Sequence, residues 1–405
     1  MKPLLNKQLT HHYLRITAQN YSQQEEIYLT MTHSYLSRFR WILIFMFWLS
    51  PLEAKAQQTQ HYSYKQYSYK FVSFSQVKLP PEYTFFTPAW ITDRGKVYGS
   101  LSDNSATGNP HIAVYQKGTF TVLQPGFAGP TNNSGTVGGS VSGDGINVLL
   151  QAALFKKNNV EIIPLQPGYN FSFIWSLNDP GTALVESDDT DGKPTYTLYR
   201  NSTSTQLNFG PTIPRPNFLA FIGEGKFINN QGVIAGTNAS NVNSYTPGTT
   251  GFRFDTKTGQ ALLLQPLPTD TLAWGLGINN RGEVLGYSFV ATNPYHENIG
   301  VWDKKGVFHT YFYETISSNA LVFNDNDLIV ITLVEGQNIS YLIPQPGVRL
   351  NIADLVTNLP AGQDLQNIFC INNNGSMIGV DSKGSYFLLK RINTNSLDDD
   401  SLDQS

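Results

Sequence analysis

The sequence has 405 residues, enough to bury one large core or two smaller ones, and only 14% of them are charged. Its 34 glycines, 22 prolines, 21 tyrosines and 24 phenylalanines favour many short strands joined by tight turns over long amphipathic helices. The net charge of −3, with lysines and arginines dispersed along the chain, argues against nucleic acid or another polyanion as a partner. The single cysteine, Cys370, excludes an intrachain disulfide and a cysteine-based zinc site, and its apolar neighbours predict a core position.

Residues 1–56 are predicted to be a leader that contains a secretory signal peptide. Arg38 and Arg40 precede an apolar run over residues 41–49, and small residues then stand at the third and the last positions before Gln57. This order predicts cleavage before Gln57. The apolar run is about half of the roughly 20 residues that cross a bilayer, so a retained anchor is the weaker alternative and no stable span is expected after cleavage.

Two further expectations concern the ends of this leader. Residues 1–30 are polar and would make it unusually long, so we expect translation to start at Met31. Residues 57–66 are predicted to be a short linker. The product is then expected to be secreted, periplasmic or exposed at the cell surface.

Seven copies of one short pattern follow. Each copy reads an apolar residue, two positions that are almost always Asn or Asp, any residue, Gly, and then alternating small and apolar residues. Asn and Asp favour turns and Gly readily takes a positive φ, so each copy predicts a tight hairpin; the sixth copy has Asp327 at the glycine position. The copies span residues 91–99, 131–139, 177–185, 228–236, 278–286, 323–331 and 371–379.

A second, aromatic-rich hairpin follows each copy, which gives four short strands per repeat. The copies start 40 to 51 residues apart, and a period of this length with four strands is typical of a propeller blade. After the seventh copy only a third strand remains, near residues 385–390, and residues 69–77 could supply the missing fourth. The sequence therefore predicts an all-β, seven-bladed β-propeller over residues 67–391, closed by this N-terminal strand, with an acidic tail over residues 392–405.

The repeats also resemble a named family. The pattern Ile-Asn-Asn-x-Gly-x-Val-x-Gly, followed by an aromatic strand, is similar to the bacterial extracellular HAF repeats, most closely at residues 228–236, 278–286 and 371–379. The resemblance implies an exported bacterial repeat protein. It implies no activity and no catalytic residues.

No metal or cofactor motif stands out. The histidines at positions 61, 111, 296 and 309 lack the spacing of a zinc site. Asp189, Asp191 and Gly192 match part of a calcium loop, but the downstream glutamate is absent, so a hairpin tip is the preferred interpretation. No cofactor is expected.

The loops on one face of the predicted propeller are rich in aromatic residues. Exposed aromatic clusters often mark contacts with glycans or proteins, although some of these rings could instead pack between blades. The predicted ligand-binding residues are Tyr169, Phe171, Phe173, Trp175, Phe218, Phe221, Trp274, Tyr295 and His296.

Three functions remain open at this point. The first is a non-catalytic exported propeller that binds a glycan or a protein through the aromatic face. The second is an extracellular hydrolase or lyase, with Glu186 or Asp188 paired with Glu224 as acid and base in the central channel. The third is a structural protein of the cell surface.

Overall fold

A computed structural model describes residues 66–102, 110–142, 150–157, 159–214, 216–218, 226–239, 249–290, 292–314, 318–335 and 337–392. These residues belong to the compact unit Ser63–Ser405. The predictions about the leader, the start at Met31, the cleavage before Gln57 and the acidic residues beyond position 392 lie outside the described residues. Among the described residues, no helix is long and apolar enough to cross a membrane.

The chain is all-β, and its strands follow the sequence repeats four at a time. The first group contains β2 (Phe85–Ile91), β3 (Val97–Ser102), β4 (His111–Gln116) and β5 (Thr119–Pro125); the second contains β6 (Phe127–Thr131), β7 (Val137–Ser142), β8 (Leu150–Lys156) and β9 (Asn159–Ile162). The third contains β10 (Tyr169–Leu177), β11 (Ala183–Asp189), β12 (Pro194–Arg200) and β13 (Thr203–Gln206); the fourth contains β14 (Pro216–Asn217), β15 (Val233–Asn238), β16 (Thr250–Asp255) and β17 (Gln260–Leu264).

The remaining strands continue this order. The fifth group contains β18 (Leu272–Ile278), β19 (Val284–Val290), β20 (Asn293–Trp302) and β21 (Phe308–Glu314); the sixth contains β22 (Ser318–Phe323), β23 (Ile329–Glu335), β24 (Gln337–Gln345) and β25 (Val348–Asn351). The last contains β26 (Asn367–Ile371), β27 (Met377–Val380) and β28 (Tyr386–Arg391), joined by β1 (Tyr69–Ser73). Two short 3₁₀ helices, Phe74–Gln76 and Ile352–Leu355, connect strands.

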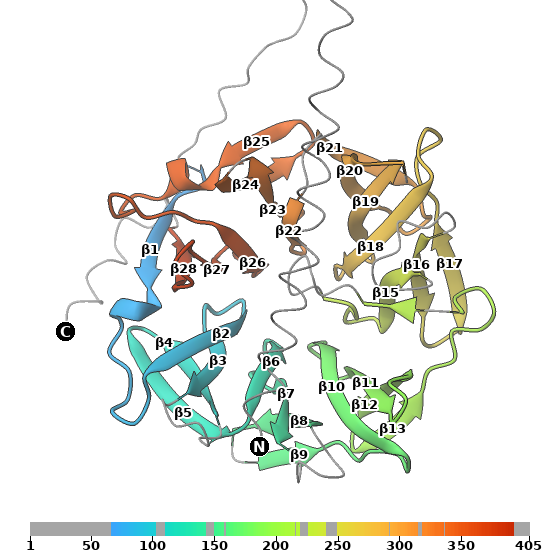
Figure 1. Cartoon of the computed structure of the whole chain (residues 1–405), viewed down its shortest axis with the longest axis horizontal. Coiled ribbons are helices and arrows are strands. Elements are labelled where there is room, and N and C mark those ends of the chain that lie inside the picture. The colour runs from blue at the N-terminus through green and yellow to red at the C-terminus, as the bar shows by residue number, and fades with distance from the viewer. Residues whose placement is uncertain are drawn as a thin grey trace, which may run out of the picture. The chain divides into compact units, whose positions relative to one another are not determined.

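Each group forms an antiparallel four-stranded sheet with its strands in chain order, except that β1 forms the edge of the last sheet beside β28. The second and third sheets are joined into one by a single parallel pairing between Phe171 of β10 and Leu150 of β8. Figure 1 shows the sheets around a common centre, with β2, β6, β10, β18, β22 and β26 closest to it. In these six repeats the strand that precedes the Asn-Asn turn is therefore the inner strand.

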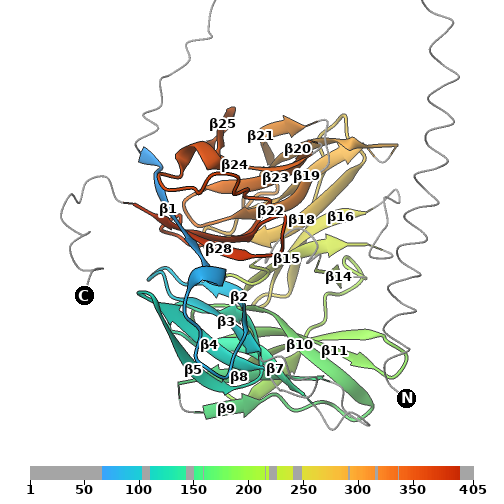
Figure 2. The same ribbon diagram turned by 60° about the vertical axis from the view of Figure 1, so that its left-hand side comes forward.

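The predicted pairing between the two ends of the repeat region is present. β1 pairs with β28 antiparallel, from Tyr69 opposite Arg391 to Ser73 opposite Phe387, and Figure 2 shows the two strands side by side. β1 is shorter than the expected strand over residues 69–77, because the 3₁₀ helix begins at Phe74. On its other side β1 contacts the segment after β25, where the Phe71 N–H donates to Asn358 Oδ1 at 2.6 Å.

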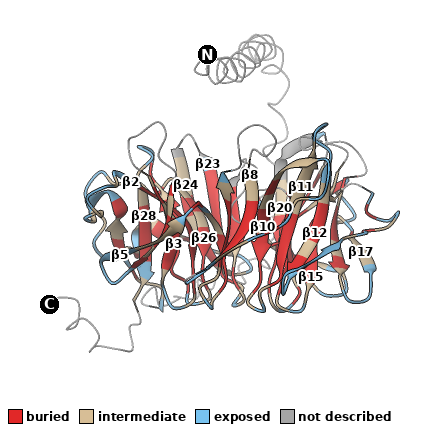
Figure 3. Cartoon of the chain, turned by 90° about the horizontal axis from the view of Figure 1, so that it is seen from below, coloured by how far each residue is buried: buried red, intermediate tan, exposed pale blue. Residues whose placement is uncertain are grey.

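The core lies between neighbouring sheets, and Figure 3 shows buried residues along the length of the strands. One cluster joins Leu342 of the sixth sheet to Met377 of the last sheet and to Tyr69 and Phe71 of β1. Cys370 is 2% exposed and packs in the cluster between the last and first sheets, which confirms its predicted core position. Burial between sheets, with strands alternating in direction, accounts for the short apolar stretches of the repeat.

Each Asn-Asn-x-Gly segment forms the predicted tight turn. The glycine of the turn has a φ between 72° and 86° in six repeats, and Asp327 takes a φ of 60° in the sixth. The side chain at the first Asn position closes the turn; in the seventh repeat, for example, Asn372 Oδ1 accepts the N–H of Ser376 at 2.9 Å. Short polar side chains and a residue that tolerates positive φ are therefore both needed at each turn.

Candidate functional site

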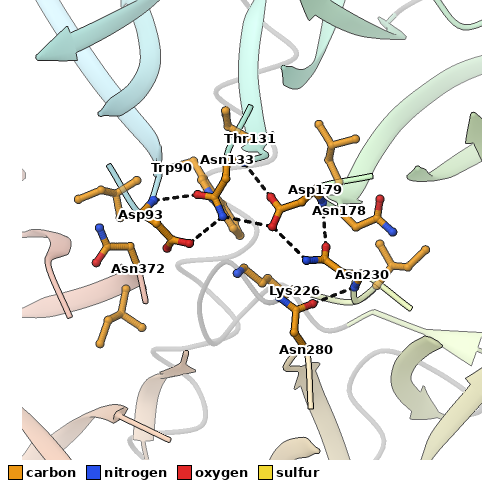
Figure 4. Close-up of a pocket in the computed structure, with 14 residues that line it drawn as sticks. Trp90, Asp93, Thr131, Asn133, Asn178, Asp179, Lys226, Asn230, Asn280 and Asn372 are labelled. Atoms are coloured by element: carbon orange, nitrogen blue, oxygen red, sulfur yellow. Dashed lines mark hydrogen bonds between the residues drawn. The ribbon is translucent and has the colours of Figure 1, made fainter. Parts of the chain in front are cut away.

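The second Asn or Asp of each turn has a role beyond the turn itself. Its backbone N–H donates to the side-chain oxygen of the equivalent residue in the next repeat, at 2.7 to 2.9 Å. The last of these bonds runs from Asn373 back to Asp93, so the seven bonds form a closed cycle. The cycle, called here the Asn/Asp ring, contains Asp93, Asn133, Asp179, Asn230, Asn280, Asp325 and Asn373; Figure 4 shows the part from Asp93 to Asn280.

Amide and carboxylate side chains nearly alternate around the Asn/Asp ring. Asn373 donates its side-chain N–H groups to both neighbouring carboxylates, those of Asp93 and Asp325, at 3.0 and 2.8 Å. In a ring of seven members, perfect alternation is impossible, and one pair of like neighbours must occur. That pair is Asn230 and Asn280, which are neutral, so no two carboxylates are adjacent in the ring.

The described residues of the Asn/Asp ring enclose little free space. Lys226 and Trp90 also line this space (Figure 4), and the remaining cavity is about 20 Å³. That volume holds about one water molecule. Burial of Asp179 opposes its ionisation, but hydrogen bonds from Asn133 and Asn230 outweigh burial and lower the pKa of Asp179. The charge of Lys226 makes a smaller contribution in the same direction. The described part of the centre is therefore a structural hub, and the central-channel enzyme hypothesis gains no support from it.

A much larger pocket, called here the Trp175 pocket, lies between the third and fourth repeats. Its volume is about 1120 Å³. The third sheet contributes Trp175, Glu186, Asp188 and Tyr196, and the connection to the fourth sheet contributes Phe209, Ile213 and Phe218. A concave, mostly apolar pocket with a few polar groups is the usual form of a small-ligand site.

An aromatic row leads along β10 into the Trp175 pocket. Phe171 and Phe173 have ring centroids 5.5 Å apart, and Phe173 and Trp175 have theirs 4.7 Å apart. These side chains occur at every second position of a strand, so they share one face of the sheet. All three are partly exposed. Trp175 lies at a β-bulge, since the pairing of β10 with β11 shifts between Ile174 and Ser176.

Two carboxyl groups lie beside this aromatic row. Phe173 is opposite Glu186 and Phe171 is opposite Asp188 across the β10–β11 pair. The indole N–H of Trp175 donates to Glu186 Oε2 at 2.7 Å. Tyr196 completes the row on β12, opposite Glu186, and its hydroxyl contacts both the Glu186 carboxyl and the Pro216 carbonyl, to which it donates at 3.3 Å.

Both carboxyl groups hold their protons more tightly than usual. Burial raises the pKa of Glu186, and the negative charge of Asp188 raises it further, against the opposing hydrogen bonds from Trp175 and Tyr196. Burial also raises the pKa of Asp188, with a smaller contribution from the charge of Asp189. The two side chains lie two positions apart on β11, and each affects the pKa of the other. They therefore form a coupled carboxyl pair.

The structure places the predicted ligand-binding residues in three groups. Tyr169, Phe171, Phe173 and Trp175 form one row, but they lie in strand β10 and not in a loop, because their alternation with smaller residues has the period of a strand. Phe218 lines the Trp175 pocket but is only 2% exposed, so it packs between sheets.

The other predicted residues do not join this site. Trp274 is in β18, where its ring packs against the ring of Phe289 with their centroids 5.1 Å apart. Tyr295 and His296 are in β20, but their side chains lie outside the described part, as do Phe221 and the proposed carboxylate partner Glu224. Tyr196 and Phe209 were missed by the sequence analysis, although the predicted β11–β12 hairpin would have placed Tyr196 near Glu186.

The remaining motifs have structural explanations. Asp189 Oδ1 accepts the N–H groups of Asp191 and Lys193 at 3.0 and 2.9 Å, so the partial calcium motif is a hairpin tip, as preferred. His309 lies 3.4 Å from an Asp303 carboxylate oxygen, and His111 contacts the ring of Tyr83. Within the described ranges, no three His, Cys, Asp or Glu side chains are grouped as a metal site would require.

Comparisons with known proteins bear on the fold. No protein-family model matches the sequence, and a search of curated proteins found no match. The structure is similar to the β-propeller domain of the Trilobed protease from Pyrococcus furiosus, with a TM-score of 0.52 and 10% identity over 76% of this chain and 97% of that domain. It is also similar to an acylaminoacyl peptidase from Pyrococcus horikoshii, with a TM-score of 0.50 and 11% identity, over 76% of this chain and 52% of the peptidase. At these identities the likeness shows the fold alone: an all-β architecture related to β-propellers.

Proposed function

We propose that residues 67–391 form a seven-bladed β-propeller that binds a glycan in the Trp175 pocket without cleaving it. The closed Asn/Asp ring, with one member from each repeat, supports the count of seven. The pairing of β1 with β28 supports closure by the N-terminal strand. We also propose, from the leader and the resemblance to HAF repeats, that this propeller is exported.

The observation that carries the binding function is a large pocket in which Trp175, at the end of the aromatic row, lies beside the carboxyl pair. A sugar ring has an apolar face of C–H groups and a rim of hydroxyl groups. The partly exposed rings of Phe173 and Trp175 offer an apolar platform, and Glu186 and Asp188 offer acceptors for hydroxyl groups. A concave site of this volume fits a short oligosaccharide better than a protein surface, which usually requires a flatter contact.

The geometry of the carboxyl pair argues against glycoside hydrolysis. Glycosidases hold their two carboxyl groups at least roughly 5 Å apart, because the substrate or a water molecule must lie between them. Glu186 and Asp188 lie two positions apart on β11, so both project from the same face of one strand and do not face each other across a substrate. A coupled pair with raised pKa values can instead keep a proton, donate one hydrogen bond and accept others, which suits recognition of hydroxyl groups.

The test is a binding screen followed by a matched pair of variants. The full chain is screened against immobilised glycans, and the affinity for the best ligand is measured by calorimetry. Trp175→Phe keeps an aromatic ring but removes the N–H that orients Glu186, and we expect it to weaken binding by about tenfold. Trp274→Phe, on another inner strand, should leave the affinity unchanged.

Three results would contradict the proposal. If the wild-type chain binds no glycan at millimolar concentration, the ligand is not a glycan. If the Trp175 and Trp274 variants lose affinity equally, the glycan does not bind in the Trp175 pocket. Release of new reducing ends from the bound glycan during incubation would move the hydrolase hypothesis to first place.

A further inference from the structure

Five cationic side chains meet in one groove on the side of the molecule that carries the Asn-Asn turns. This groove, called here the basic groove, has a volume of about 820 Å³ and lies where the last sheet meets the first. Its only described carboxylate is that of Asp93. The five cations come from β1, from the turn after β2, from the β4–β5 turn and from β28: Lys70, Arg94, Lys117, Lys390 and Arg391.

The carboxylate of Asp93 is already used within the Asn/Asp ring. Asp93 Oδ2 accepts hydrogen bonds from the amides of Asn133 and Asn373 at 2.7 and 3.0 Å. Its Oδ1 accepts the backbone N–H of Asn373 at 2.9 Å. The one carboxylate of the basic groove is thus held by amide donors, while the five cations surround a space that a ligand could enter.

Arg391 is positioned before any ligand arrives. Its guanidinium group donates to the backbone carbonyls of Asn374 and Gln66, at 3.2 Å each, and lies 5.0 Å from the ring centroid of Tyr67. A guanidinium fixed in this way loses little freedom when it binds an anion.

The closure of the repeat region also places two lysines directly opposite each other. Lys70 of β1 and Lys390 of β28 are register partners, and both are exposed. Like charges in directly opposed positions are unfavourable. The lysines and arginines are dispersed in the sequence, as the sequence analysis noted, but the fold gathers five of them here.

We propose that the basic groove binds the acidic segment of the same chain, which contains Asp398, Asp399, Asp400 and Asp403. Arg391 lies in the groove, and Asp398 follows it by seven residues. A stretch of that length reaches at most roughly 25 Å, so the segment can return to the groove from which the chain departs. Tethering raises its effective concentration there to the millimolar range. Four carboxylates complement the five cations, and the site is distinct from the Trp175 pocket.

The test is zero-length cross-linking of the full chain with a carbodiimide, which joins carboxylates to lysine amines that are in contact. We expect cross-links from the acidic segment to Lys70, Lys117 or Lys390 at low ionic strength. About 1 M salt should reduce them by about tenfold, because the screening length falls to roughly 3 Å. Lys305 is the matched control, since it is exposed in the β20–β21 turn, the equivalent of the β4–β5 turn that holds Lys117.

Further measurements make each outcome decisive. Replacing the four aspartates with asparagine should abolish the cross-links, and a labelled peptide of residues 393–405 should then bind that variant. Lys117→Gln should lower the affinity for the peptide by about fivefold, while Lys305→Gln should leave it unchanged. The proposal is wrong if Lys305 is cross-linked as efficiently as the groove lysines, or if the peptide does not bind. It is also wrong if a mixture of isotope-labelled and unlabelled chains gives mainly cross-links between two copies.

Discussion

Glu186 is a carboxyl group whose ionisation the fold opposes. Burial and the neighbouring Asp188 raise its pKa above the ordinary value of 4.5. At pH values between the ordinary pKa and the raised pKa, the folded protein holds a proton at Glu186 that the unfolded chain has already lost. The free energy of unfolding must therefore fall as the pH rises through this window, and the cost is fully present above it.

Glu186→Gln removes that cost while keeping an oxygen that can accept the Trp175 N–H. We expect the variant to have a higher free energy of unfolding than the wild type at pH 7 and no advantage at pH 4. Urea unfolding at the two pH values measures both differences.

Glu161 provides a control, because its pKa is shifted in the opposite direction. Hydrogen bonds from Lys156, Ser202 and Tyr199 lower its pKa to about 2, so its stabilising contribution is present above the ordinary pKa and is lost as the pH falls through the folded value. Glu161→Gln should therefore destabilise the protein at pH 7. A loss of stability in both variants at pH 7 would show that Glu186 is ionised and stabilising, contrary to the raised pKa.

At the scale of the element, two equivalent turns allow backbone strain to be separated from crowding. Gly375 and Gly95 occupy the same position of the turn, with φ values of 83° and 72°. A Cβ at Gly375 would lie 3.0 Å from Arg391 Nη1, whereas a Cβ at Gly95 would have no heavy atom within 4 Å.

Gly95→Ala should therefore cost about 1 kcal/mol, from the positive φ alone. Gly375→Ala should cost about 2 kcal/mol, since Arg391 must also move. Denaturant unfolding of the two variants gives the comparison. Equal losses would mean that Arg391 adjusts freely, and would weaken the argument that it is positioned in advance of a ligand.

The elements were predictable because each repeat carries its own local signals. Asn-Asn-x-Gly marks a turn through side-chain hydrogen bonds and positive φ, and both causes act within a few residues. Even the replacement of Gly by Asp327 was tolerated as expected. The Asn/Asp ring was missed because its bonds join residues at least 40 positions apart. A signal existed, however: the second turn position is Asn or Asp in all seven copies, which a turn alone does not require.

At the scale of the whole molecule, the candidate sites depend on which repeats become neighbours. The aromatic residues of β10 were identified from their pattern, and Glu186 and Asp188 were considered as acids. The hydrogen bond from Trp175 to Glu186 depends on the bulge in the pairing of β10 with β11, which no spacing in the sequence reveals. The basic groove was even harder to predict from the sequence, because Lys70 and Lys390 are separated by most of the chain and become neighbours only when β1 pairs with β28.

The junction of the last and first repeats is therefore the place where the whole fold can be tested. It is held by the Asn373–Asp93 bonds of the Asn/Asp ring and by β1, whose Tyr69 and Phe71 are buried beside Met377. Removing β1 would expose these apolar groups of the last sheet and leave β28 as an open sheet edge.

We expect a chain that begins at Phe74 to be less stable than one that begins at Gln66 by at least about 3 kcal/mol. Burial of two aromatic side chains accounts for roughly 3 to 6 kcal/mol. Urea unfolding compares the two chains, and an added peptide of residues 66–77 should restore part of the lost stability by pairing with β28. If the two chains are equally stable, the N-terminal strand does not close the propeller, and the Asn/Asp ring alone must hold the first and last repeats together.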